Sequence, residues 1–340
     1  MPKIGRQTWD FSKGQGVYVA GVGTVAGQLE SAGPLGRDFD VHLENDRVDG
    51  DTWEHSEQSM FGTAAQIALE NARITSQELD MLIGADLNAQ LTSFYLGLRG
   101  HSVPALGVYS ACASICEALA IGGLIVHTQH GQRVLAGTSS HTSTAERQFR
   151  YPTEYGAQKP PTAQRTATGS GVAVLTNEPS RIQITHATVG KVMDYGVTSP
   201  WEMGAAMAPS AADTIRAHLN DTGRSLRDYD CVATGDLGHI GHTLLKELLT
   251  KEGLTDVGHL TDCGVLIYDS AQPDVFSGGS GGACCSLVTF GHLLKRVLNG
   301  SYKRILVSAT GALLSAVSAQ QHDSIPGVSH AIAFERKDGN

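Results

Sequence analysis

The sequence has few charged side chains and no excess of basic ones. Charged residues make up 17% of the 340 residues, against roughly 25% in an average soluble domain. A low charge content leaves less free surface per residue, which indicates a large subunit interface. The formal net charge is −9, and phosphate binding needs a basic surface. We therefore expect no nucleic-acid partner.

Long hydrophobic runs and patterned cysteines are also lacking. The longest near-continuous apolar stretch, residues 118–126, is about half the length that a membrane span needs. Residues 1–10 contain no apolar run of the kind found in a signal peptide. We therefore expect a cytoplasmic protein without a transmembrane segment, whose membrane contact is peripheral. The cysteine spacing is not typical of a zinc site or a disulfide scaffold, so we expect reduced thiols and no metal site. The cysteines are Cys112, Cys116, Cys231, Cys263, Cys284 and Cys285.

Glycine and alternating apolar segments are what the chain does have. Glycine accounts for 40 residues, which points to tight turns and close backbone approaches. Short apolar runs predict strands at residues 16–24, 79–86 and 103–108, and helical spacing predicts helices at 53–71 and 112–129. Such alternation is typical of an α/β fold, in which helices cover both faces of a parallel or mixed sheet.

The second half of the chain repeats the first. Residues 80–86 match residues 230–236, and residues 133–139 match residues 304–310, in the same order. A repeat of whole αβ units predicts two similar halves stacked into one layered body. We place the halves at residues 1–178 and 179–340. Asp86 and Asp236 end equivalent strands, where they either anchor loops or line a pocket.

The sharpest local feature is the segment Tyr-Ser-Ala-Cys-Ala-Ser at residues 109–114, between a predicted strand and a predicted helix. Free N–H groups at a helix start and the positive end of its dipole stabilise a thiolate or a bound anion. Cys112 is therefore a candidate nucleophile. The alternative is a small buried cysteine that packs at the helix start.

Two βαβ-rich repeats with a cysteine before the first central helix resemble the thiolase and ketoacyl synthase superfamily. The resemblance implies a five-layered α/β/α/β/α body and a cysteine that takes an acyl group from coenzyme A or acyl carrier protein. Two further residues, His/His or His/Asn, assist that cysteine. They would fall near Asp236 and near Gly279 and Ser280, where neither type is present. In one hypothesis the protein is an acyltransferase that uses Cys112 as its nucleophile and His239 as the substitute base. The other hypothesis is a fold without catalysis.

A more specific resemblance is to the stage V sporulation protein AD family of endospore-forming bacteria. It implies a thiolase fold that binds dipicolinic acid (pyridine-2,6-dicarboxylate), with or without calcium, and catalyses nothing. It also implies membrane-protein partners of the same sporulation transport system, uptake of dipicolinate into the developing spore, and peripheral association with the inner forespore membrane. The matching blocks are residues 7–9, 33–36, 138–160, 203–209, 262–264, 309–315 and 334–336.

The loop at residues 141–165 suits a flat dianion. Such a ligand needs convergent donors for two carboxylates and a flat surface for its ring, and this loop interleaves four cations with three aromatic residues. Alternatively, the loop forms the interface of a homodimer, since Arg and Tyr are enriched there too. We expect no cofactor. The expected ligand-binding residues are Cys112, Asp86, His141, Arg147, Arg150, Tyr151, Lys159, Asp236, Gly279 and Ser280.

Overall fold

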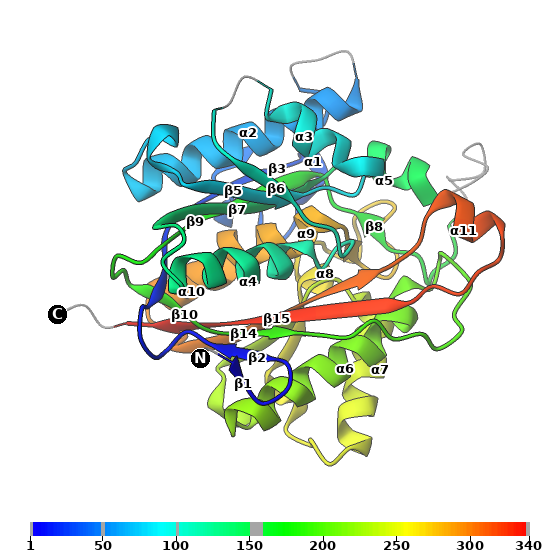
Figure 1. Cartoon of the computed structure of the whole chain (residues 1–340). Helices are drawn as coiled ribbons and strands as arrows, with labels where there is room; N and C mark the ends of the chain where they lie inside the picture. The colour runs from blue at the N-terminus through cyan, green and yellow to red at the C-terminus, as the bar shows by residue number, and fades with distance from the viewer. Residues whose placement is uncertain (1–2, 49–51, 100–101, 150–158, 338–340) are drawn as a thin grey trace.

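A computed structural model describes residues 3–48, 52–99, 102–149 and 159–337 (Figure 1). Its large sheet contains ten strands in continuous order, with three short strands beside them. The order is β12 (Leu260–Asp262), β11 (Cys231–Thr234), β14 (Arg304–Ala312), β15 (Gly327–Arg336), β10 (Ile182–Val189), β3 (Val17–Ala26), β9 (Gly169–Thr176), β7 (Arg133–Ser140), β5 (Met81–Ala85) and β6 (Ala105–Gly107). The short strands are β1 (Lys3–Ile4), β2 (Thr8–Asp10) and β4 (Val41–His42).

The ten strands form two halves of identical topology. In the first half β5 runs parallel to β6 and β7, and β9 runs antiparallel to β7 and β3. In the second half β11 runs parallel to β12 and β14, and β15 runs antiparallel to β14 and β10. A short antiparallel ladder between β3 and β10 joins the two halves. The repeat that the sequence predicted is therefore a repeat of strand order and direction.

Helices complete five layers, which Figure 1 shows stacked one above another. α2 (Trp53–Ala72) and α3 (Thr92–Gly97) cover the first half, and α6 (Met203–Thr222) and α7 (Gly238–Lys251) cover the second. The middle layer holds α4 (Ser114–His127) and a helix over residues 282–298. That helix consists of α9 (Gly282–Leu287), the π-helical turn η7 (Val288–Leu293) and α10 (Leu294–Leu298). The fold class predicted from the sequence is confirmed.

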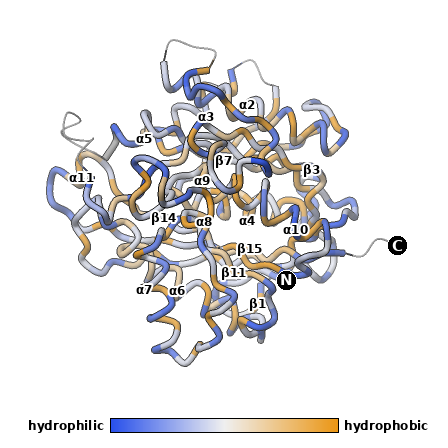
Figure 2. Tube along the Cα trace, turned by 180° about the vertical axis from the view of Figure 1, so that it is seen from behind, coloured by the Kyte–Doolittle hydropathy of each residue, from blue (hydrophilic) through white to orange (hydrophobic). Residues whose placement is uncertain are grey.

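Three hydrophobic cores fill the space between the five layers. One lies between α2 and the first half of the sheet, one between α6 and the second half, and the largest surrounds the middle helices. α4 is apolar on most of its circumference because it contacts strands of both halves. Its Gly122 and Gly123 allow this close packing, since an added Cβ at Gly123 would lie 2.9 Å from Phe11. In Figure 2 the inner strands and helices carry most of the hydrophobic colour.

The predicted elements match the observed ones to within a few residues. The strand expected at residues 16–24 is β3, and those at 79–86 and 103–108 contain β5 and β6. The helices expected at 53–71 and 112–129 are α2 and α4. The boundary between residues 178 and 179 stays a prediction. The remaining elements are α1 (Gln28–Ser31), α5 (Thr142–Phe149), α8 (Cys263–Leu266), α11 (Ala316–Gln320), β8 (Arg165–Thr166) and β13 (Gly279–Ser280).

Candidate functional site

Cys112 lies on a tight turn just before α4. Ala111 has φ 51°, a left-handed conformation that is uncommon outside glycine. The Ser114 hydroxyl holds the turn, since it accepts from the Ser110 N–H at 2.9 Å and donates to the Ala111 carbonyl at 2.7 Å. Gly311 of β14 passes so close that an added Cβ would lie 2.1 Å from the Ser110 carbonyl oxygen. The turn is therefore fixed from both sides.

The thiol faces the two loops on which the superfamily carries its assisting residues. Cys112 Sγ lies 3.8 Å from Ser280 Oγ, and the Asp236 carboxylate lies near enough to raise the pKa of the thiol. Asp236 also accepts from the Ser280 hydroxyl (3.0 Å), the Gly281 N–H (3.0 Å) and the Thr310 hydroxyl (2.7 Å). The structure thus brings Cys112, Asp236 and Ser280 together, as the resemblance to the thiolase and ketoacyl synthase superfamily implied.

This environment disfavours a thiolate. Burial raises the pKa of Cys112 well above its ordinary value, and the negative charge of Asp236 raises it further. Burial also raises the pKa of Asp236 to about 6, although the hydroxyl and amide groups that donate hydrogen bonds to its carboxylate lower that pKa. A nucleophilic cysteine needs a lowered pKa or an adjacent base. The turn therefore has the geometry of a nucleophile site, while burial and Asp236 favour the protonated form of the Cys112 thiol.

A small cavity opens beside the thiol. Its volume is about 30 Å³, space for about two water molecules. Tyr109, Thr166 and Ser280 contribute hydroxyl groups to its wall, and none of the described residues that line it is a lysine, arginine or histidine. The other lining residues are Leu87, Ala111, Cys112, Met203, Ala312 and Leu314. Anion binding in this cavity would rest on neutral donors.

The two expected histidines are not part of this cavity. His239 is exposed on the first turn of α7, where its N–H donates to the Ser277 carbonyl at 2.7 Å. His141 is fully buried, bonded to the Asp46 carbonyl (3.0 Å) and packed on Trp53. Burial lowers the pKa of His141. The structure therefore offers no support for His239 as the base of Cys112, and His141 holds its loop.

The described cations of the loop at residues 141–165 are paired with acids, most of them from distant parts of the chain. Arg147 pairs with Glu54 of α2. Lys159 and Arg165 both contact Asp274, at 2.5 and 3.0 Å, and Lys159 also contacts Glu146 at 3.4 Å. These residues do not line the cavity at Cys112. Arg150 and Tyr151, also expected to bind the ligand, lie outside the described residues.

Asp86 has different hydrogen-bond partners from Asp236, its equivalent in the second half. It is buried and accepts from the N–H groups of Asn88 and Phe94, each at 2.6 Å. Burial raises its pKa to about 6. Beside it Glu57 of α2, also buried, accepts from Asn88, Ser139 and Thr144. Burial raises the pKa of Glu57 to about 7, with the charge of Asp86 as the second cause. Asp86 thus anchors the loop that leads into α3.

Sequence reasoning missed three residues of these networks. Glu57 stands on the apolar face of α2, and its neighbours Met60 and Phe61 were a signal that this carboxylate is buried. Thr310 lies in the repeated block at residues 304–310, so the repeat could have drawn attention to it. Gln164 ties the two assisting loops together through bonds to the carbonyls of Asp236 (2.6 Å) and Gly279 (2.9 Å). No local pattern marks Gln164.

Two kinds of feature are absent from the described residues. No group of three or more His, Cys, Asp or Glu side chains in those ranges is arranged to hold a metal ion. In the same part of the chain no helix has both the length and the apolar character required to cross a bilayer.

Comparisons with known proteins place this geometry in context. The family model of stage V sporulation protein AD (SpoVAD) matches residues 5–335. Stage V sporulation protein AD of Bacillus subtilis (strain 168) is 44% identical over 340 residues, which cover 100% of this chain and 99% of that protein.

Solved structures of enzymes share the fold. The 3-oxoacyl-[acyl-carrier-protein] synthase III of Aquifex aeolicus VF5 has a TM-score of 0.59 at 16% identity, covering 94% of this chain and 100% of that one. Human mitochondrial 3-ketoacyl-CoA thiolase in complex with CoA has a TM-score of 0.59 at 14% identity, covering 95% and 98%. At these identities the likeness shows the fold alone. With a family match along nearly its full length, this chain belongs to the stage V sporulation protein AD family and is a sporulation protein with a thiolase-like fold.

Proposed function

We propose that this chain is a non-catalytic member of the thiolase-like superfamily that binds dipicolinic acid for its uptake into the developing spore. The observation that carries the proposal is that Asp236 and Ser280 lie at Cys112, where the superfamily resemblance implies a proton-transfer pair. A carboxylate beside a buried thiol opposes the nucleophile that condensation requires. Membership of a sporulation family supports the ligand class.

The cavity beside Cys112 is the proposed binding site, and its lining sets the form of the ligand. The wall described above offers hydroxyl groups and no cation, while Asp236 adds a carboxylate behind Ser280. A dianion bound alone would be repelled by the Asp236 carboxylate, and no cation of the wall would offset that repulsion. We therefore propose that dipicolinate binds with calcium, which neutralises its two carboxylates. The cavity must widen to admit it, and Met203 and Leu314 at its wall are the flexible side chains that could move.

Calorimetric titration tests the proposal. Dipicolinate should bind in the presence of calcium and bind more weakly without it, while the 2,3-dicarboxylate isomer should fail in both conditions. Ala312→Leu, which fills the cavity, should weaken binding at least about tenfold, as expected when a pocket loses its space. Thr63→Leu, on the exposed face of α2, is the matched control. Equal affinity for both isomers would count against the proposal.

The acyltransferase alternative has its own test. Incubation with an acyl-CoA followed by intact-mass measurement should show no acyl adduct on Cys112, because the thiol stays protonated. An adduct that disappears in Cys112→Ala would establish the alternative instead.

We further propose a homodimer formed through β6. This strand ends the sheet, and Tyr95, Leu106 and Tyr109 near it are nearly half exposed. Long apolar side chains at an open sheet edge are typical of an interface. Leu106→Glu should convert the dimer to a monomer in light scattering, while Val317→Glu, on exposed α11, should not. A monomeric wild-type protein would contradict this proposal.

The remaining proposals concern location and partners. We propose that the chain is cytoplasmic, associates peripherally with the inner forespore membrane, and passes dipicolinate to membrane proteins of the same transport system. Family membership supports these proposals. Co-purification with those membrane proteins from sporulating cells is the test.

A further inference from the structure

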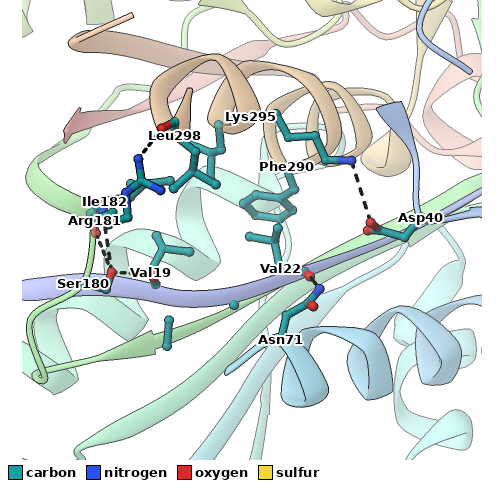
Figure 3. Close-up of a pocket in the computed structure, with 13 residues that line it drawn as sticks. Val19, Val22, Asp40, Asn71, Ser180, Arg181, Ile182, Phe290, Lys295 and Leu298 are labelled. Atoms are coloured by element: carbon teal, nitrogen blue, oxygen red, sulfur yellow. Dashed lines mark hydrogen bonds and ion pairs between the residues drawn. The ribbon is translucent and has the colours of Figure 1, made fainter. Parts of the chain in front are cut away.

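A second and larger cavity lies between β3, the middle helix at residues 282–298 and the end of α2. It is a groove with a volume of about 470 Å³. Figure 3 shows its walls, with Val19 and Val22 on β3 and Phe290 and Leu298 on the helix. These walls are mostly apolar, so an occupant must bring an apolar body.

The strand edge inside the groove is already satisfied by side chains. The Ser180 hydroxyl donates to the Val19 carbonyl at 2.6 Å, and the Asn71 amide donates to the Val22 carbonyl at 2.8 Å (Figure 3). An added peptide strand would need such carbonyls as acceptors. The groove therefore favours an occupant that fills space over one that extends the sheet.

Two basic side chains line the groove, and three more lie on the surface beside it. Arg181 and Lys295 line the groove, at opposite sides of the view in Figure 3. The Lys337 N–H bonds to the Arg181 carbonyl (2.9 Å), and Lys303 lies next to this strand end, because its carbonyl accepts from the N–H of the residue before Lys337 (2.8 Å). Arg296 follows Lys295 on α10. We call Arg181, Lys295, Arg296, Lys303 and Lys337 the basic face.

Four of the five cations of the basic face form no ion pair within the residues that the structure describes. Lys295 alone among the five has a carboxylate within ion-pair distance in the described part of the chain, Asp40 at 3.8 Å. Arg181 donates to the Leu298 carbonyl (2.6 Å), and Arg296 stacks over the Tyr302 ring (5.0 Å). Neither contact neutralises a guanidinium. Asp40 also lines the groove, and Asp230 accepts from the Lys303 backbone N–H at 2.7 Å. In a chain with a net charge of −9, the basic face still carries more cations than these two carboxylates.

We propose that this face docks the protein on an anionic phospholipid bilayer, with the basic face on the lipid phosphates and the groove around the apolar part of one lipid. Basic clusters are attracted to anionic leaflets, and apolar burial adds to that attraction. The inference deepens the proposed membrane association and is independent of dipicolinate binding.

Vesicle flotation with the full chain tests the inference. Wild-type protein should float with vesicles that contain phosphatidylcholine and phosphatidylglycerol in equal parts and should stay behind with phosphatidylcholine alone. Salt at about 1 M, which shortens the Debye length to about 3 Å, should release it. Flotation with both vesicle types alike, or with neither, would overturn the proposal.

Matched variants locate the surface. Lys303→Glu with Lys337→Glu should weaken partitioning at least about tenfold, since each basic residue near an anionic surface contributes measurably to binding. Lys246→Glu with Lys251→Glu on α7 changes the net charge equally and should change partitioning less than about threefold. Ala20→Phe, which fills the groove from β3, should also weaken flotation. Equal losses in both charge-reversed pairs would refute the assignment of the face.

The outcomes separate this inference from the proposed function. Failure of vesicle binding together with co-purification with membrane proteins would overturn the lipid proposal alone. The variant Lys303→Glu with Lys337→Glu should keep the dipicolinate affinity of the wild type, because the basic face does not line the cavity at Cys112.

Discussion

At the scale of single residues, Asp86 and Asp236 show how a repeat can diverge. Both end equivalent strands and are buried, and burial raises the pKa of both to about 6. Asp86 bonds to backbone N–H groups and holds a loop. Asp236 faces Cys112, whose pKa is raised by burial and raised further by the charge of this carboxylate. The same residue at the same place therefore anchors one half and controls a cysteine in the other.

Asp236→Asn should increase the rate at which iodoacetamide alkylates Cys112 severalfold at neutral pH. The substitution removes the negative charge beside the sulfur, so the thiol loses its proton more readily. Asp86→Asn is the matched control and should leave the rate at Cys112 unchanged. The rates are measured by mass spectrometry of the peptide that contains Cys112, and an unchanged rate in Asp236→Asn would contradict the assigned role of the carboxylate.

A buried imidazole should shape the pH dependence of stability. Burial lowers the pKa of His218 to about 3, and its ring bonds to the hydroxyls of Thr188 and Tyr229. The unfolded chain takes up this proton as pH falls below about 6.5 and the folded chain does not. The contribution of His218 to the free energy of unfolding is thus complete above that pH and declines toward pH 3.

Urea unfolding of the wild type and of His218→Gln measures this contribution. The difference between the two free energies of unfolding should shrink as pH falls from 6.5 to 4. The comparison with the variant is necessary because burial raises the pKa of Glu30 and Asp262 to about 7, and these carboxyls favour the folded state as pH falls. A pH-independent difference would be inconsistent with a neutral buried His218.

At the scale of elements, the sequence predicts what is local and misses what is distant. The strands β3 and β5 and the helices α2 and α4 carry their own apolar patterns, so periodicity locates them. The resemblance to the thiolase and ketoacyl synthase superfamily likewise implies that Asp236 and Ser280 reach the turn at Cys112. The ion pairs of Lys159 with Asp274 and of Arg147 with Glu54 join residues far apart in the chain. No local pattern discloses such pairs, so from the sequence alone a loop rich in cations suits either a ligand site or a subunit interface.

Gly311→Ala should destabilise the protein by about 1–3 kcal/mol, the usual cost of forced overpacking. The added Cβ would lie 2.1 Å from the Ser110 carbonyl oxygen, at the turn that holds Cys112. Gly62→Ala is the matched control, because Gly62 lies within α2 with nothing near its missing Cβ. That change should stabilise the protein by up to about 1 kcal/mol. Urea unfolding measures both, and equal effects would argue against the close contact.

At the scale of the whole molecule, the two halves depend on each other. The middle helices pack against strands of both halves, and the largest core contains residues from each. Separating the halves at residues 178 and 179 would expose that core to water. We infer that the protein unfolds as one unit despite its internal repeat.

Circular dichroism and intrinsic fluorescence should therefore report a single, coincident urea transition. The fragments 1–178 and 179–340 should each be largely unfolded or aggregated when expressed alone and should regain native spectra when expressed together. A fragment that folds by itself would show that the halves are independent domains.

The side chains along β3 have one more consequence. Asn71 and Ser180 occupy its outer carbonyls, and Asp40 accepts from the Thr24 N–H at 3.0 Å and from its hydroxyl at 2.7 Å. An open strand with free backbone groups is a template for fibril growth. These contacts occupy backbone groups on which a strand of a second molecule would have to pair, so they protect this edge of β3 against fibril growth.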